Sequence, residues 1–153
     1  SWDSSHSCIL YSKFTMINTI FTEVPFDKIE YLTRPEFING TEQKFYNELK
    51  KSVQEKGLLD PLFLKNTDGK LKVIVGNNRM VICKKLEIKK IKCIITQIGK
   101  EDTFLKGKIL KTDKEIKDLF YLPEEVTVRR TKGGWVDQVN ATKFITIRNK
   151  YEI

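Results

Sequence analysis

One stretch constrains this chain more than any other: residues 73–83, which read VIVGNNRMVIC. A β-branched run stops at Gly76, two asparagines and Arg79 follow, and the next residues have the pattern of a helix. This order predicts a strand, a tight turn and the start of a helix. A glycine in such a turn can adopt a positive φ angle or let a ligand approach the backbone closely.

The predicted helix start is a candidate phosphate site. Asn77 or Asn78 could cap the helix by accepting a hydrogen bond from its first N–H groups. The remaining N–H groups and the positive end of the helix dipole favour an anion there. Arg79, in the first turn, could clamp a phosphate with its fork of donors. A plain strand–turn–helix corner with a surface arginine is the alternative that these residues leave open.

Length and composition indicate one domain with an appended segment, because 153 residues with 40% hydrophobic content are enough for a packed core. No apolar run is long enough to span a bilayer, and the start lacks a secretory signal pattern. The three cysteines lack C-x-x-C spacing, so neither a disulfide framework nor a zinc site is expected. A reducing, cytoplasmic location fits best. Cys83 and Cys93 are expected to be core residues rather than nucleophiles.

The charge is strongly basic. A formal net charge of +8 and a pI near 9.3 favour polyanions, which include nucleic acid, nucleotides and acidic membrane faces. Many lysines alternate with acidic residues along the expected helices, so a solvated, salt-bridged surface is the alternative.

The chain in order predicts a compact α+β unit. Residues 1–16 are expected to form a poorly ordered leader, either native or added. The elements expected after it are a strand at 20–26, a helix that ends at Gly57, two antiparallel strands at 62–65 and 70–75 joined by an Asp68-Gly69 turn, a helix from Met80 and a strand at 92–98.

From Gly99 the pattern changes, and residues 99–153 are expected to form a C-terminal α/β extension packed on or beside the core. Its expected elements are a helical stretch at 102–120, or a shorter helix at 114–120, and strands at 126–130 and 144–148. The turn between the two strands is basic and carries an aromatic residue, a combination that can follow a phosphate backbone and stack on a base. The candidate nucleic-acid contacts there are Arg129, Arg130, Lys132 and Trp135. A tail that only covers the core is the alternative.

Three short motifs follow one another along the chain. They are Arg34-Pro35 after the first expected strand, the segment GLLDP at 57–61 after the first expected helix, and the G-x-x-R turn Gly76-Asn77-Asn78-Arg79. In this order and spacing, residues 24–98 resemble the ParB/sulfiredoxin-like superfamily, in particular the ParB N-terminal nucleotide- and DNA-binding domain. The resemblance implies a domain at 17–98 with a small mixed β-sheet and two packed helices.

The resemblance also implies a phosphate-centred site. A nucleoside triphosphate, DNA, or both would be the partners, in phage or mobile-element biology, and no membrane is expected. The positions that match the family's nucleotide site are Gly57, Leu58, Gly76, Asn77, Asn78, Arg79 and, less directly, Arg34. Mg²⁺ would accompany a triphosphate, but no protein ligand for it can be named.

The chain departs from the family pattern in three ways. A typical ParB turn has glutamate and arginine where Asn77 and Asn78 stand, so an acid that could assist catalysis or hold a metal is missing. The cysteine of sulfiredoxin-like members is absent between Gly76 and Arg79, so sulfinic-acid reduction is not expected. No helix-turn-helix pattern is evident after Gly99, so centromere-type DNA reading is not expected.

Two other classes of function remain open. A nuclease, an NTPase or a kinase-type phosphotransferase would need an acid near the turn, and the candidates are Glu23, Asp27, Glu36 and Asp60. His6 is the only histidine and lies in the leader, so no histidine chemistry is proposed. A protein-interaction module that uses the aromatic C-terminal part would show no salt-dependent affinity for nucleic acid.

Overall fold

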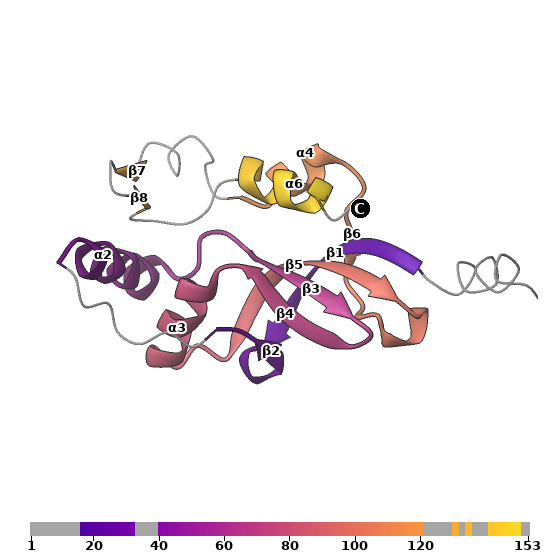
Figure 1. Ribbon diagram of the computed structural model, residues 1–153, viewed down its shortest axis with the longest axis horizontal. Coiled ribbons are helices and arrows are strands. Elements are labelled where there is room, and N and C mark those ends of the chain that lie inside the picture. Colours follow the sequence, from indigo (N-terminus) through magenta and orange to yellow (C-terminus); the bar gives the residue numbers. More distant parts are fainter. Residues whose placement is uncertain (1–15, 33–39, 121–129, 132–133, 136–140, 151–153) are drawn as a thin grey trace, which may run out of the picture.

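The computed structural model describes residues 16–32, 40–120, 130–131, 134–135 and 141–150, and it shows an α+β fold (Figure 1). A mixed sheet of six strands has the order β2-β4-β3-β5-β1-β6. Its strands are β1 (Met16–Pro25), β2 (Ile29–Glu30), β3 (Leu62–Thr67), β4 (Lys70–Val75), β5 (Lys90–Gly99) and β6 (Lys108–Ile109). Strand β2 runs parallel to β4 and β3 parallel to β5, whereas the other neighbours are antiparallel. The predicted fold class is confirmed.

The helices lie on both sides of this sheet, with α3 on one side and α4 and α6 on the other (Figure 1). The remaining elements are α2 (Gly40–Lys56), α3 (Asn77–Lys85), α4 (Asp113–Lys117), α6 (Ala141–Lys150), the 3₁₀ turns η1 (Phe26–Lys28) and η2 (Glu101–Thr103), and a separate ribbon of β7 (Arg130–Thr131) and β8 (Gly134–Trp135). Within the described ranges, no helix has both the length and the apolar character that crossing a membrane requires.

Strand β3 shows why the sheet has two buried faces. Successive side chains point to opposite faces of a strand. Leu62 and Leu64 therefore pack in one cluster with Met80 of α3, whereas Phe63 between them packs in a second cluster. There Phe63 stacks on Phe144 of α6 with a ring-centroid distance of 5.5 Å. The sheet is thus sandwiched between α3 and the C-terminal helices.

A β-bulge shapes the end of β4. Phe63 pairs with Val75, but its neighbour Leu64 pairs with Val73, so Ile74 is an extra residue on β4. A bulge bends its strand and increases the local twist. The bend comes two residues before Gly76 and re-aims the chain at the point where α3 begins.

Buried amides fix the register of the three central strands. Gln97 of β5 lies between Asn18 of β1 and Asn66 of β3 in the pairing. The Gln97 amide donates to Asn18 Oδ1 at 3.0 Å and accepts from Asn66 Nδ2 at 2.8 Å. Asn66 and Gln97 are buried and Asn18 is half-buried, so a slip by one residue would leave buried amide groups unpaired, and the amides therefore specify the register.

Several local predictions are confirmed. Strand β4 has the predicted bounds, and Asp68 and Gly69 both have positive φ angles (52° and 92°), as a tight hairpin turn requires. Helix α2 is followed by Gly57 with φ 75°, the left-handed conformation of a helix C-terminal glycine. The leader at 1–15 lies outside the described residues.

Two predictions for the C-terminal part are wrong. Residues 144–148 are predicted as a strand but belong to helix α6, because Ala141 and Phe144, three residues apart, bury one helical face against the core. The helix predicted over 102–120 is reduced to α4, where Thr112 caps the helix by accepting from Glu115 N at 3.2 Å. The alternative of a short helix in this region is nearer to the structure. Of the strand predicted at 126–130, only Arg130 is described.

Candidate functional site

Three chain segments meet at the N-terminus of α3. They are Gly76–Arg79 itself, the end of the segment after β2, and residues 57–61 between α2 and β3. The amide of Leu32 donates to Asn77 Oδ1 at 3.0 Å. Arg79 Nη1 donates to the main-chain carbonyl of Asp60 at 2.8 Å. The structure therefore brings the two predicted site segments, 57–58 and 76–79, to one corner of the sheet.

Gly76 is the hinge of this corner. It is the N-cap residue of α3 with φ 123°, and its carbonyl accepts the first helical hydrogen bond from Met80 N at 2.9 Å. A Cβ at this position would lie 2.7 Å from Leu62 Cγ and 3.3 Å from Arg79 Nη2. Both the backbone angle and the space therefore demand glycine. Because glycine has no side chain, the N-cap position offers no oxygen to the N–H groups of the first turn.

The predicted capping role of the two asparagines is wrong. The helix begins at Asn77, and no side chain at the N-cap position makes a capping hydrogen bond. Asn77 is thus the first helical residue, and its Oδ1 accepts from Leu32 N instead. Asn78 is exposed at the second helical position. Asn77 links the turn to Leu32, and Asn78 follows it in the helix. The N-cap residue itself is Gly76, which has no side chain.

Arg79 lies beneath the turn. The residue is only 2% exposed, and its partner residue Asp60 is 1% exposed. The sequence predicts that Arg79 is either an exposed phosphate clamp or a surface arginine. The burial of Arg79 agrees with neither alternative. The reason is the orientation of α3, which buries Arg79, Met80 and Cys83 against the sheet. Since a buried charge must be hydrogen-bonded, the guanidinium ties the segment before β3 to the helix.

Two buried thiols adjoin the guanidinium. Burial raises the pKa of Cys83 to about 11 and that of Cys93 to about 12, and the charge of Arg79 lowers both pKa values only in part. Both thiols are protonated at neutral pH and 0% exposed. The prediction that they are core residues is confirmed, and neither can act as a nucleophile in this environment.

The acids proposed for catalysis are dispersed. Asp60 lies at the turn but is buried, whereas Glu23 and Asp27 are exposed on β1 and η1. Strands β3 and β5 separate β1 from β4, a distance of about 14 Å at the usual strand spacing. Glu36 lies outside the described residues. In the part of the chain that the structure describes, no three histidine, cysteine, aspartate or glutamate side chains form a group that could hold a metal ion.

The remaining candidates are only partly described. Arg34 lies two residues after Leu32, outside the described residues. Among the nucleic-acid candidates, Arg129 and Lys132 are also outside. Arg130 of β7 pairs with Trp135 of β8 in an antiparallel ribbon, for which the backbone alone is described.

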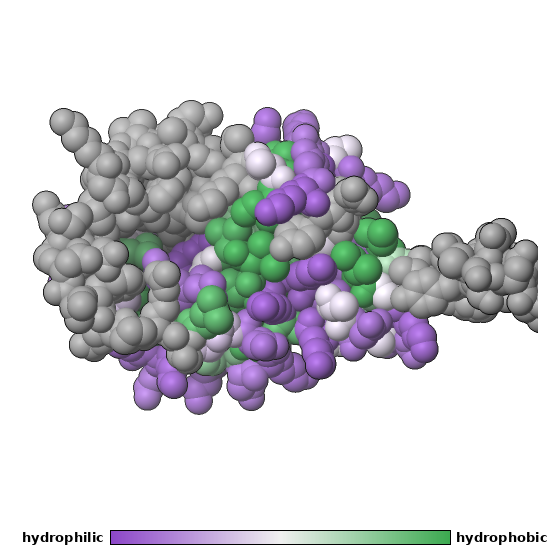
Figure 2. Space-filling view, in the orientation of Figure 1, coloured by the Kyte–Doolittle hydropathy of each residue, from purple (hydrophilic) through white to green (hydrophobic). Residues whose placement is uncertain are grey.

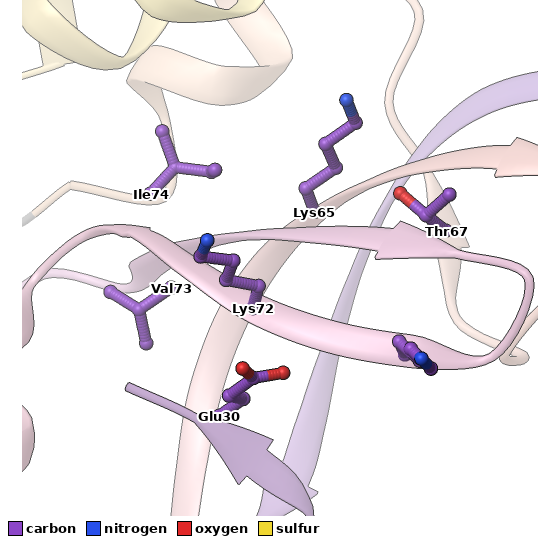
Figure 3. Close-up of a pocket in the computed structure, with 7 residues that line it drawn as sticks. Glu30, Lys65, Thr67, Lys72, Val73 and Ile74 are labelled. Atoms are coloured by element: carbon purple, nitrogen blue, oxygen red, sulfur yellow. The ribbon is translucent and has the colours of Figure 1, made fainter. Parts of the chain in front are cut away.

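A hollow beside the β3–β4 hairpin was not foreseen from the sequence. It has a volume of about 530 Å³ and is lined by Glu30, Lys65, Thr67, Lys70, Lys72, Val73 and Ile74 (Figure 3). The sequence contained one indication of this hollow. Lys70 and Lys72 alternate with Leu71 in a predicted strand, which places the two lysines on the same face of the sheet. The position of Lys65 of β3 opposite Lys72 depends on the strand register, which the sequence alone does not reveal.

Comparisons with solved structures report modest similarity. Sulfiredoxin from Arabidopsis thaliana is 28% identical with a TM-score of 0.42, and the match covers 50% of this chain and 83% of that one. The Pnob8-like ParB-N domain is 21% identical with a TM-score of 0.40, over 54% and 30% of the two chains. Chromosome-partitioning protein ParB from Caulobacter crescentus, C-terminally truncated and complexed with CTP-γ-S, is 18% identical with a TM-score of 0.39, over 49% and 43%.

The chain therefore spans less than half of each of these two ParB chains. A search of curated proteins finds no match. The family comparison is decisive, because the model of the ParB N-terminal domain matches residues 12–107, which is more than half of the chain. The chain belongs to the ParB N-terminal domain family.

Proposed function

We propose that this domain binds a nucleotide, with the phosphate groups at the first turn of α3, residues Gly76–Arg79. The observation that carries the proposal is the glycine N-cap of α3, which leaves no side-chain oxygen at the place where a ligand oxygen can sit. Helix N-termini of this kind accept phosphate because N–H groups and the helix dipole act together. Membership of the ParB N-terminal domain family supports the proposal.

The buried guanidinium adds its charge from behind the turn. Arg79 Nη2 lies 3.3 Å from the position of a Cβ at Gly76, so the cation is directly beneath the backbone that would face the phosphate. Charges interact more strongly in the protein interior than in water. Arg79 would therefore favour an anion at the turn without contacting it, and it would hold the turn in place through the Asp60 carbonyl.

Neighbouring residues would complete the site. Leu58 is partly buried beside the clusters of α2 and α3, and with Gly57 it would form the edge that a base or a sugar contacts. Arg34 would supply a further positive charge, since it comes two residues after Leu32 in the sequence and the Leu32 amide is bonded to Asn77. Mg²⁺ would arrive with a triphosphate, because the described residues contain no cluster that could hold it alone.

The test is a thermal-shift panel with CTP, ATP, ADP and AMP, each with and without Mg²⁺. The panel follows similar solved structures, in which ParB is complexed with CTP-γ-S and free serine kinase variants with AMP or ADP. A nucleotide that prefers the native state raises the melting temperature, and a ligand at a hundred times its Kd adds about 2.7 kcal/mol of stability. Recovery of the intact nucleotide afterwards would favour binding over the NTPase alternative.

The variant Asn78→Asp localises the site. A carboxylate at an exposed first-turn position stabilises the helix but repels a phosphate. We expect unchanged or higher stability of the free protein and about tenfold weaker nucleotide binding. Gln54→Glu, an exposed position on α2 with the same change in charge, is the matched control and should bind like the wild type. Equal affinity in both variants, or no response to any nucleotide, would contradict the proposal.

A further inference from the structure

The hollow beside the β3–β4 hairpin lies on the other side of the sheet from the turn site. Leu64 and Val73 pack toward α3, so the alternation along each strand points Lys65 and Lys72 to the opposite side. Figure 3 shows Lys65, Lys72 and Ile74 on that side of the hairpin, with Glu30 on the neighbouring strand. In the space-filling view, hydrophilic residues cover the hairpin (Figure 2).

Like charges are forced together in this hollow. Lys65 of β3 stands directly opposite Lys72 of β4 in the register, and Lys70 lies on the same face two residues before Lys72. Like charges in directly opposed positions destabilise a sheet. Glu30 of β2 pairs with Lys72 of β4 and is the one acidic side chain among the described residues of the lining. Three ammonium groups against one carboxylate leave an excess of positive charge.

The chemistry of the lining fits a polyanion. Lys70, Lys72 and Thr67 are exposed, so their polar groups can reach a ligand in the hollow. Lysine binds phosphate as a point charge without a demand for one orientation. Ile74, which is half-buried, adds an apolar surface against which a sugar or a base can lie.

We propose that this lysine hollow, formed by Lys65, Lys70, Lys72 and Thr67 with Val73 and Ile74, binds the phosphate backbone of a nucleic-acid strand. A strand carries its charges on the backbone itself. An acidic polypeptide carries them on flexible side chains, whose ordering costs conformational entropy. The net charge of +8 adds a long-range attraction for such a polymer. The lysine hollow is separate from the turn, so this proposal does not depend on nucleotide binding there.

The test is fluorescence anisotropy with a labelled single-stranded DNA of 20 nucleotides, titrated at several salt concentrations. The test variant is Lys65→Gln/Lys72→Gln, and the control is Lys84→Gln/Lys89→Gln, which removes two exposed lysines from the α3 region. Each pair removes two of the positive charges from the net +8, so the overall charge is matched. The melting temperature of each variant checks that it is folded before its DNA affinity is compared.

Counterion release sets the expected size of the effect. Loss of two phosphate contacts to a single strand lowers the log–log salt slope by about 1.4 and the affinity at 0.1 M salt by roughly 25-fold. The control pair should lose at most about threefold, and nucleotide affinity should be unchanged in both variants. Equal losses in the two pairs, or no DNA binding by the wild type, would overturn the proposal. Displacement of the DNA by poly-glutamate as readily as by unlabelled DNA would assign the lysine hollow to an acidic polypeptide and also overturn it.

Discussion

The corner at Gly76 and the lysine hollow both involve strands β3 and β4, but they differ in how their positive charges are buried. At the corner the cation Arg79 is buried and hydrogen-bonded to a carbonyl. In the lysine hollow Lys70 and Lys72 are exposed, and the half-buried Lys65 stands opposite Lys72. A buried, bonded charge is fixed in position and little screened by salt, whereas exposed charges adapt to their ligand and are screened. The corner should therefore be sensitive to geometry, and the lysine hollow to ionic strength.

The largest expected effect follows removal of the buried cation. Arg79→Met keeps a long side chain but leaves the buried carbonyl of Asp60 without its donor. We expect a loss of about 3 kcal/mol in the free energy of unfolding, measured by urea denaturation. Arg148→Met is the contrast, because its partner Asp113 has a side chain that is 52% exposed. That variant should lose less than about 1 kcal/mol. Equal losses would remove the distinction between a buried hydrogen bond to a carbonyl and an ion pair whose acidic partner is exposed.

A smaller effect is expected from the glycine hinge. Gly76→Ala places a methyl group 2.7 Å from Leu62 Cγ at a φ angle of 123°. The expected cost is about 2–3 kcal/mol, with a loss of nucleotide binding. At Gly57, where φ is 75° and no atom lies within 4 Å of a Cβ, alanine bears only the backbone cost of about 1 kcal/mol. The melting temperatures of the two variants are compared by calorimetry. A smaller loss of stability for Gly76→Ala than for Gly57→Ala would contradict the close packing around Gly76.

A separate, pH-dependent effect concerns the thiols next to Arg79. Burial raises the pKa of Cys83 from 9.0 to about 11 and that of Cys93 from 9.0 to about 12. The unfolded chain therefore releases these protons first, and the stabilisation is complete below pH 9 and lost as the pH rises through 11 and 12. Urea denaturation between pH 8 and pH 10.5 should show the fall. In Cys83→Ala/Cys93→Ala the fall should be shallower, and an unchanged slope would count against the effect of burial.

The sequence predicts local features of the corner well. The turn at Gly76, the hairpin turn at Asp68-Gly69 and the glycine after α2 each depend on backbone angles that few residues adopt. Such preferences can be recognised without knowledge of the fold. The burial of Arg79 could not be predicted in this way, because its partner Asp60 is 19 residues away and the orientation of α3 decides the contact.

Longer-range packing explains the other differences. Residues 144–148 are rich in β-branched side chains, which favour a strand, but burial of Ala141 and Phe144 on one face selects a helix. The pairing of Lys65 with Lys72 depends on the register after the bulge in β4. The phage or mobile-element setting stays a prediction.

The most direct measurement is an NMR titration of the ¹⁵N-labelled protein with CTP, or with whichever nucleotide gives the largest thermal shift. If the first turn of α3 holds the phosphates, the amide signals of Asn77, Asn78 and Arg79 should move most, because their N–H groups would face the ligand. Signals of Lys65 and Lys72 should stay in place. Movement confined to other parts of the molecule, with the α3 turn unaffected at saturation, would contradict the account.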